Sequence, residues 1–319
     1  MTNNKSRRDF LKTSIGIAGV VAAGSILKSH PLFAQDIAAA AGITAATGSR
    51  LAVVQGPVEF AVTKALELLG GMSRFVKPGA VVMVKPNVSF PNPKTWGTGS
   101  SPEAVLAVVK EALKAGAGRV IVADNTMRQG MESFTRTGLV EALAGIDRVK
   151  ILALQEESLF VEVPVPNGEA LKTVKIARLA LKADVLINLP CAKSHTATEV
   201  SFGLKNNMGL IWDRSFFHTG TDIHSAIAEL ATVVRHHLTI LDATRALITN
   251  GPTGPGKVQE LGMIVASTDL LAVDAYATTL ANWNNRTVKP RGIKHLELAS
   301  KLKVGEIDLS RMEIVKVSV

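Results

Sequence analysis

The chain has 319 residues, 47% of them hydrophobic and 20% charged, which is the composition of a folded globular protein. Its net charge of +9 lies partly in the first 34 residues and includes no basic stripe interleaved with aromatic residues, which argues against a nucleic-acid partner. The single cysteine, Cys191, excludes an intramolecular disulfide and any all-cysteine zinc or iron–sulfur site built from this chain alone.

The first 40 residues have the successive parts of an export signal. Residues 6–12 (SRRDFLK) form a twin-arginine motif, and residues 13–27 form an apolar stretch too short to span a membrane comfortably. Small residues that suit cleavage follow, either at Ala34 or within residues 38–41. We therefore expect the twin-arginine translocation machinery to export the protein to the periplasm; an uncleaved signal that retains it at the membrane is the alternative.

Short β-branched runs alternate with helical patterns along residues 50–319, which we expect to form a single domain. Strands are predicted at residues 51–55, 80–84, 119–123, 149–154, 184–189, 238–241, 263–266 and 314–319. Helices are predicted at residues 58–69, 102–115, 203–210, 223–236 and 270–281, and a hairpin at residues 160–176. This alternation predicts an α/β fold with a mainly parallel sheet and helices on both faces.

Polar clusters follow several of the predicted strands. They are Lys85-Pro86-Asn87, Asp124-Asn125, residues 190–195 and Asp242. Any one cluster is typical of a turn or a helix cap. In open parallel sheets, however, ligands bind at the carboxyl ends of the strands, so the clusters together predict a site at this edge.

Residues 188–256 contain the highest density of candidate site residues. His195, His218 and His224 could supply nitrogen ligands to Ni, Zn or Fe, with Asp242 as a fourth ligand or as the acceptor that orients an imidazole. The histidines are 23 and 6 residues apart, so they do not form a compact ligand motif.

Two lysines and a glycine-rich loop in the same segment favour an anionic ligand. Lys193 and Lys205 lie in loop-like sequence, where they could hold a carboxylate or phosphate, or act as a base if desolvated; solvated lysines are the alternative. Gly251 and Gly254 would let backbone N–H groups approach an anion, or would only form a rigid turn. Three further polar residues are predicted to contact a ligand or cofactor: Lys85, Asn87 and Asn206.

These motifs resemble the family catalogued as domain of unknown function 362. The matching features are Lys193-Ser-His195, residues 204–209 (LKNNMG), His224, Asp242 and residues 251–254 (GPTG), and the resemblance covers about residues 80–281. Some members carry ferredoxin-type cysteine clusters, which this chain lacks. A looser likeness to nickel-dependent lactate racemase implies Lys and His groups that hold a metal cofactor.

The sequence thus predicts an exported enzyme that acts on a small anionic metabolite, with a divalent metal (Ni, Zn or Fe) as its candidate cofactor. His195 and His224 would be ligands or acid–base groups, Lys193 and Lys205 would hold the negative charge, and Asp242 would orient an imidazole or join the metal. Two alternatives remain open: a non-catalytic periplasmic ligand- or cofactor-binding protein, and a partner subunit of a separate iron–sulfur protein.

Overall fold

A computed structural model describes residues 49–319. The predicted twin-arginine signal lies outside the described residues. Within the described part of the chain, no helix is long and apolar enough to cross a membrane.

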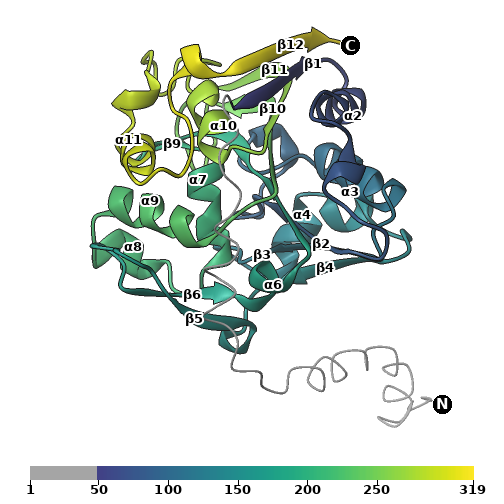
Figure 1. Cartoon of the computed structure of the whole chain (residues 1–319), viewed down its shortest axis with the longest axis horizontal. Coiled ribbons are helices and arrows are strands. Elements are labelled where there is room, and N and C mark those ends of the chain that lie inside the picture. Colours follow the sequence, from purple (N-terminus) through teal and green to yellow (C-terminus); the bar gives the residue numbers. More distant parts are fainter. Residues whose placement is uncertain (1–48) are drawn as a thin grey trace, which may run out of the picture. The chain divides into compact units, whose positions relative to one another are not determined.

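A mixed, mostly parallel sheet forms the centre of the domain (Figure 1). Its main strands run in the order β12-β1-β11-β10-β7-β2-β3-β4, and β8 and β9 extend it beside β10. The strands are β1 (Arg50–Gln55), β2 (Val81–Pro86), β3 (Arg119–Asp124), β4 (Val149–Ala153), β7 (Val185–Leu189), β8 (Cys191–His195), β9 (Glu199–Ser201), β10 (Leu238–Leu247), β11 (Val258–Ser267) and β12 (Glu313–Ser318). Strands β4, β3, β2, β7 and β10 are parallel neighbours, whereas β11 is antiparallel to β10 and to β1. The predicted α/β fold class is confirmed.

The two faces of the sheet bury separate hydrophobic cores. Successive side chains of a strand point to opposite faces, so Val82 and Val84 enter one core while Met83 enters the other. The first core lies under α2 (Val58–Leu68), α3 (Pro102–Lys114), α4 (Met131–Arg136) and α5 (Leu139–Ala142). The second lies under α6 (Arg178–Lys182), α7 (Gly203–Asn206), α8 (Ser215–Thr219), α9 (Ile223–Val233), α10 (Leu270–Ala277) and α11 (Lys294–Lys301).

The start of α3 shows how local sequence fixes an element beside the site. Pro102 occupies the first turn, where its missing N–H is not needed, and the Ser101 hydroxyl accepts a hydrogen bond from the Ala104 N–H. The Ser101 N–H in turn donates to the Asp242 carboxylate of β10 at 2.7 Å. The helix therefore begins against the sheet at a defined position.

The predicted hairpin is present as β5 (Phe160–Pro164) paired antiparallel with β6 (Thr173–Ala177). Its connecting segment is held by the buried carboxylate of Glu229 on α9, which accepts hydrogen bonds from three consecutive backbone N–H groups, at residues 169–171. This contact docks the hairpin against the helical layer.

Two differences from the prediction lie beside the site. Residues 191–195 form β8 instead of a polar loop, and all five are buried. Strand β10 continues past Asp242 to Leu247, with a register shift between Ala243 and Arg245. Asp242 is therefore an interior residue of a long strand, because the antiparallel partner β11 extends the pairing beyond the predicted end.

Candidate functional site

A cavity of about 330 Å³ lies at the carboxyl ends of the parallel strands. Most of the predicted polar residues line it: Lys85 from the end of β2 and Asn87 just after it, Lys193 and His195 from β8, Lys205 and Asn206 from α7, and His218 from α8. Of the four predicted strand-end clusters, residues 85–87 and 190–195 meet at this cavity, whereas Asp124-Asn125 and Asp242 are absent from its lining.

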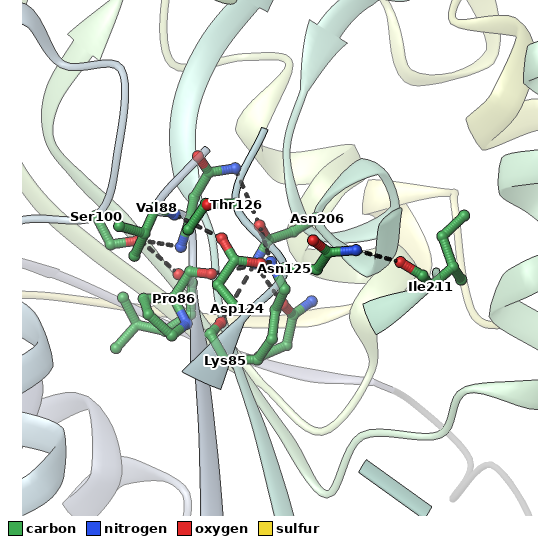
Figure 2. Close-up of polar contacts among 12 residues, drawn as sticks. Lys85, Pro86, Val88, Ser100, Asp124, Asn125, Thr126, Asn206 and Ile211 are labelled. Atoms are coloured by element: carbon green, nitrogen blue, oxygen red, sulfur yellow. Dashed lines mark hydrogen bonds and ion pairs between the residues drawn. The ribbon is translucent and has the colours of Figure 1, made fainter. Parts of the chain in front are cut away.

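Lys85 is a buried cation whose hydrogen-bonding capacity is fully used. Its Nζ lies 2.9 Å from Asp124 Oδ1 and donates to Asn206 Oδ1 at 2.8 Å and to the Pro86 carbonyl at 2.9 Å (Figure 2). An ammonium group has three N–H donors, so none is left for a ligand. Burial lowers the pKa of Lys85 to about 8, and the neighbouring Asp124 carboxylate opposes that shift. Lys85 therefore belongs to the scaffold of the cavity.

The predicted pair Asp124-Asn125 ties the end of β3 to the surrounding loops. Asp124 Oδ2 accepts from the Val88 N–H at 2.8 Å, and the Asn125 side chain donates to the Ile211 carbonyl at 2.7 Å (Figure 2). A Cβ atom at Gly209 would lie 1.9 Å from Asp124 Oδ1, so only glycine lets that segment approach the ion pair.

Helix α7 carries Lys205 and Asn206, and a buried carboxylate from α10 fixes its start. Asp274 accepts hydrogen bonds from the Gly203 N–H at 2.7 Å and the Leu204 N–H at 2.8 Å. Burial raises the pKa of Asp274 to about 7, although the two N–H donors stabilise its charged form. The sequence analysis missed this residue; an acidic residue inside the otherwise apolar segment 270–277 was the available signal.

Lys193 is buried without a carboxylate partner. Its Nζ donates to Asn87 Oδ1 at 3.0 Å and to the Thr98 carbonyl, both neutral acceptors. The side chain is 1% exposed, and burial lowers its pKa. Its positive charge is therefore not compensated by an adjacent carboxylate.

Lys205 and Arg214 also line the cavity without a carboxylate partner among the described residues. Lys205 Nζ has one hydrogen-bond partner, Met208 Sδ at 3.0 Å, and the side chain is 8% exposed. Burial, followed by the charges of Lys193 and Arg214, lowers the pKa of Lys205 to about 7. Within the described chain, neither residue forms an ion pair with a carboxylate. The sequence analysis missed Arg214, which carries no recognisable motif.

His195 offers the cavity a hydrogen-bond donor. Its Nδ1 accepts from the Ala197 N–H at 3.1 Å, so the neutral ring carries its proton on Nε2. Burial, then the charges of Lys205 and Lys193, lower the pKa of His195 to about 2, which keeps the ring neutral. A histidine that binds a metal normally donates from its other nitrogen, whereas this one accepts.

The structure does not assemble the predicted three-histidine metal site. His218 lies on the exposed side of α8, and His224 lies outside the cavity lining, stacked on His295 with ring centroids 5.7 Å apart. Among the described residues, no group of three or more His, Cys, Asp or Glu side chains could hold a metal ion. The charged groups of the cavity are mainly cations, so this donor set does not fit a divalent metal bound directly by the protein.

Three further predicted site residues have structural contacts instead. The Asp242 carboxylate receives hydrogen bonds from the backbone at Ser101 and from Thr244, and it does not line the cavity. The Gly251 N–H donates to Ser194 Oγ, and the Gly254 N–H donates to a carbonyl within its own loop. These amides are therefore already bonded, and the residues between them, Pro252 and Thr253, line the cavity.

The fold and the site define an α/β protein with a cationic cavity at the carboxyl ends of its strands. The chain belongs to the family named domain of unknown function 362, whose model matches residues 82–279. A thylakoid-associated protein of Synechocystis sp. is 28% identical over 231 residues, which cover 70% of each chain.

Two solved structures are similar to this chain at low sequence identity. The lactate racemase apoprotein from Thermoanaerobacterium thermosaccharolyticum is 15% identical with a TM-score of 0.50, and the match covers 73% of this chain. A protein from Thermotoga maritima is 13% identical with a TM-score of 0.47 over 77% of this chain. The matches span 58% and 60% of those chains, and the likeness to the racemase concerns the fold alone.

Proposed function

We propose that the domain binds a small metabolite with at least two negative charges in this cavity. The supporting observation is that Lys193, Lys205 and Arg214 contribute positive charge to one cavity without a carboxylate paired to any of them. Burying an uncompensated charge costs several kcal/mol by the usual order of magnitude, about 3–5. A bound anion would supply the missing negative charge.

Each cation suits a different part of that task. The Arg214 guanidinium can form two parallel hydrogen bonds with a carboxylate or phosphate, whereas Lys193 and Lys205 act as compact point charges. The Nε2–H of His195 adds a neutral donor. The pocket therefore combines charge neutralisation with directional hydrogen bonds, which is what selective binding of a small anion requires.

A second candidate function, proton transfer to or from the bound anion, is favoured by Lys205 in particular. A buried lysine with a pKa of about 7 is divided between its acidic and basic forms at neutral pH. Incubation with candidate carboxylates in D2O would test this function. We expect deuterium to enter the carbon beside the carboxylate with the unmodified chain, and Lys205→Met to stop the exchange without preventing folding.

The binding proposal is tested by calorimetry of the full chain with sulfate and methyl phosphate. We expect both to bind, and Arg214→Gln to weaken both. The matched control is Arg119→Gln, because Arg119 is exposed at the amino end of β3, outside the cavity lining. Absence of binding by the unmodified chain, or equal weakening by both variants, would contradict the proposal.

We also propose that the protein acts after export to the periplasm, on the strength of the twin-arginine motif in residues 6–12. Fractionation of cells that express the full chain tests this. The double substitution Arg7→Lys and Arg8→Lys should leave the protein in the cytoplasm, whereas Lys5→Arg should not change its location. Export of the double variant would rule out this route.

A further inference from the structure

The cavity is lined by apolar side chains as well as by cations. Phe90, Met127 and Met208 line it together with the lysines. The Met127 N–H donates to the Ser89 carbonyl at 3.0 Å, so the segments that carry Phe90 and Met127 are held next to each other. The two side chains therefore belong to adjoining parts of one wall, at the side of the cavity that follows β2 and β3.

The apolar wall adjoins a charge. Lys193 Nζ lies 5.5 Å from the centroid of the Phe90 ring, so a ligand atom near this ammonium is also near the ring. Met127 is 46% exposed, so part of its side chain is available to a ligand in the cavity. An apolar surface beside a binding site gains free energy when a ligand covers it.

The geometry points to a ligand that is an aromatic anion: one phosphate group, which carries two negative charges, on the cations, and a flat apolar ring against Phe90 and Met127. This inference rests on the proposed function and specifies its ligand class. Aromatic rings prefer offset or edge contacts with one another, and a methionine sulfur makes favourable contacts with ring edges. The cavity of about 330 Å³ suits a ring with one anionic substituent and is at the lower end of the range for ligand pockets.

Two phosphate monoesters of equal charge, one with a ring and one without, distinguish the contribution of the ring to binding from that of the charge. Methyl phosphate and phenyl phosphate are both mostly dianionic at pH 7, because the second pKa of a phosphate monoester is about 6. By calorimetry on the full chain, we expect phenyl phosphate to bind about tenfold more tightly, which corresponds to burial of part of the ring.

Substitutions at the apolar wall should remove this preference, measured as the ratio of the affinities for the two esters. Phe90→Ala is the direct test, and Met127→Ser is a second variant at an exposed position that tolerates a polar side chain. Phe60→Ala is the matched control, because Phe60 is 67% exposed on α2, outside the cavity lining. The control should keep the full preference for the phenyl ester.

The outcomes distinguish this inference from the function on which it rests. If the two esters bind equally to the unmodified chain, the ring has no place in the site, and the inference is wrong while the anion site stands. The inference is also wrong if both wall variants keep the tenfold preference. If neither ester binds, the proposed function itself fails and the aromatic ligand class fails with it.

Discussion

Two buried lysines line the same cavity, but only one of them has a carboxylate that balances its positive charge. Lys85 uses all three of its donors, one of them towards the Asp124 carboxylate at 2.9 Å. Among the described residues, Lys205 Nζ has one hydrogen-bond partner, the sulfur of Met208. Burial lowers both pKa values, to about 8 for Lys85 and about 7 for Lys205, although only Lys85 has an adjacent carboxylate to oppose the shift.

This difference distinguishes a lysine that stabilises the fold from a lysine that is available to a ligand in the same cavity. A charge that is paired and fully hydrogen-bonded has no capacity for a ligand, and its removal affects mainly stability. A buried charge without a counter-ion costs free energy in the ligand-free protein, and a ligand can recover that cost. Lys85 therefore belongs to the fold, and Lys205 keeps the capacity that the proposed ligand would use.

The largest effect should come from Lys85→Met. This substitution leaves Asp124 buried without its counter-ion, so we expect the free energy of unfolding to fall by about 3–5 kcal/mol. Urea denaturation of the full chain measures it. The double variant Lys85→Met with Asp124→Asn should recover most of the loss, because no charge is then left unpaired. A single variant as stable as the unmodified chain would contradict the role of Lys85 as scaffold.

Lys205→Met should have the opposite effect: weaker binding without a loss of stability. We expect the affinity for methyl phosphate to fall about 100-fold, whereas the free energy of unfolding stays equal or increases, because an uncompensated buried charge has been replaced by an apolar side chain of similar length. Calorimetry and urea denaturation of the same samples measure the two quantities. Lys64→Met, at an exposed lysine of α2, is the control. If Lys205→Met destabilised the protein as much as Lys85→Met, the two lysines would have the same structural role, which would contradict the distinction between them.

Much of this arrangement could be predicted from the sequence. The alternation of strands and helices gives the fold class, and strand-end polar residues give Lys85, Asn87 and Lys193, because parallel strands place their carboxyl ends at one edge. Strand β8 was not predicted, because its polar side chains lack the alternating apolar pattern and become buried only through pairing with distant segments.

The remaining site residues depend on contacts that no local pattern records. Asp274 acts on α7 from 70 residues away, and Arg214 enters the cavity from a segment without a motif. The same limit explains the metal prediction: His218 and His224 are close in sequence to one another, but the fold directs His224 towards His295. The sequence shows which residue types are present, but the contacts that each of these residues makes depend on the fold.

The pH dependence of binding tests the pKa of Lys205. An anion binds best to the protonated ammonium, which predominates below the pKa of about 7. The affinity for sulfate, whose charge is constant over this range, should therefore be constant at lower pH and fall by up to about tenfold for each pH unit above that value. Calorimetry of the full chain across this range measures it. Lys205→Met should lack the step at about pH 7, and a step that persists in this variant would assign the titration to another group.

The smallest effect is expected at His195. Because its pKa is lowered to about 2, the ring is a neutral donor throughout the range from about pH 5 to 9, in contrast to Lys205. His195→Phe should therefore weaken sulfate binding about fivefold, the value of one hydrogen bond of about 1 kcal/mol, and leave the shape of the pH profile unchanged. His195→Gln, which keeps a side-chain donor, should restore part of the affinity. A profile that loses a step near pH 6.5 in His195→Phe would show that the ring does titrate in the folded protein, and His195 would then join Lys205 among the groups that exchange protons in the cavity.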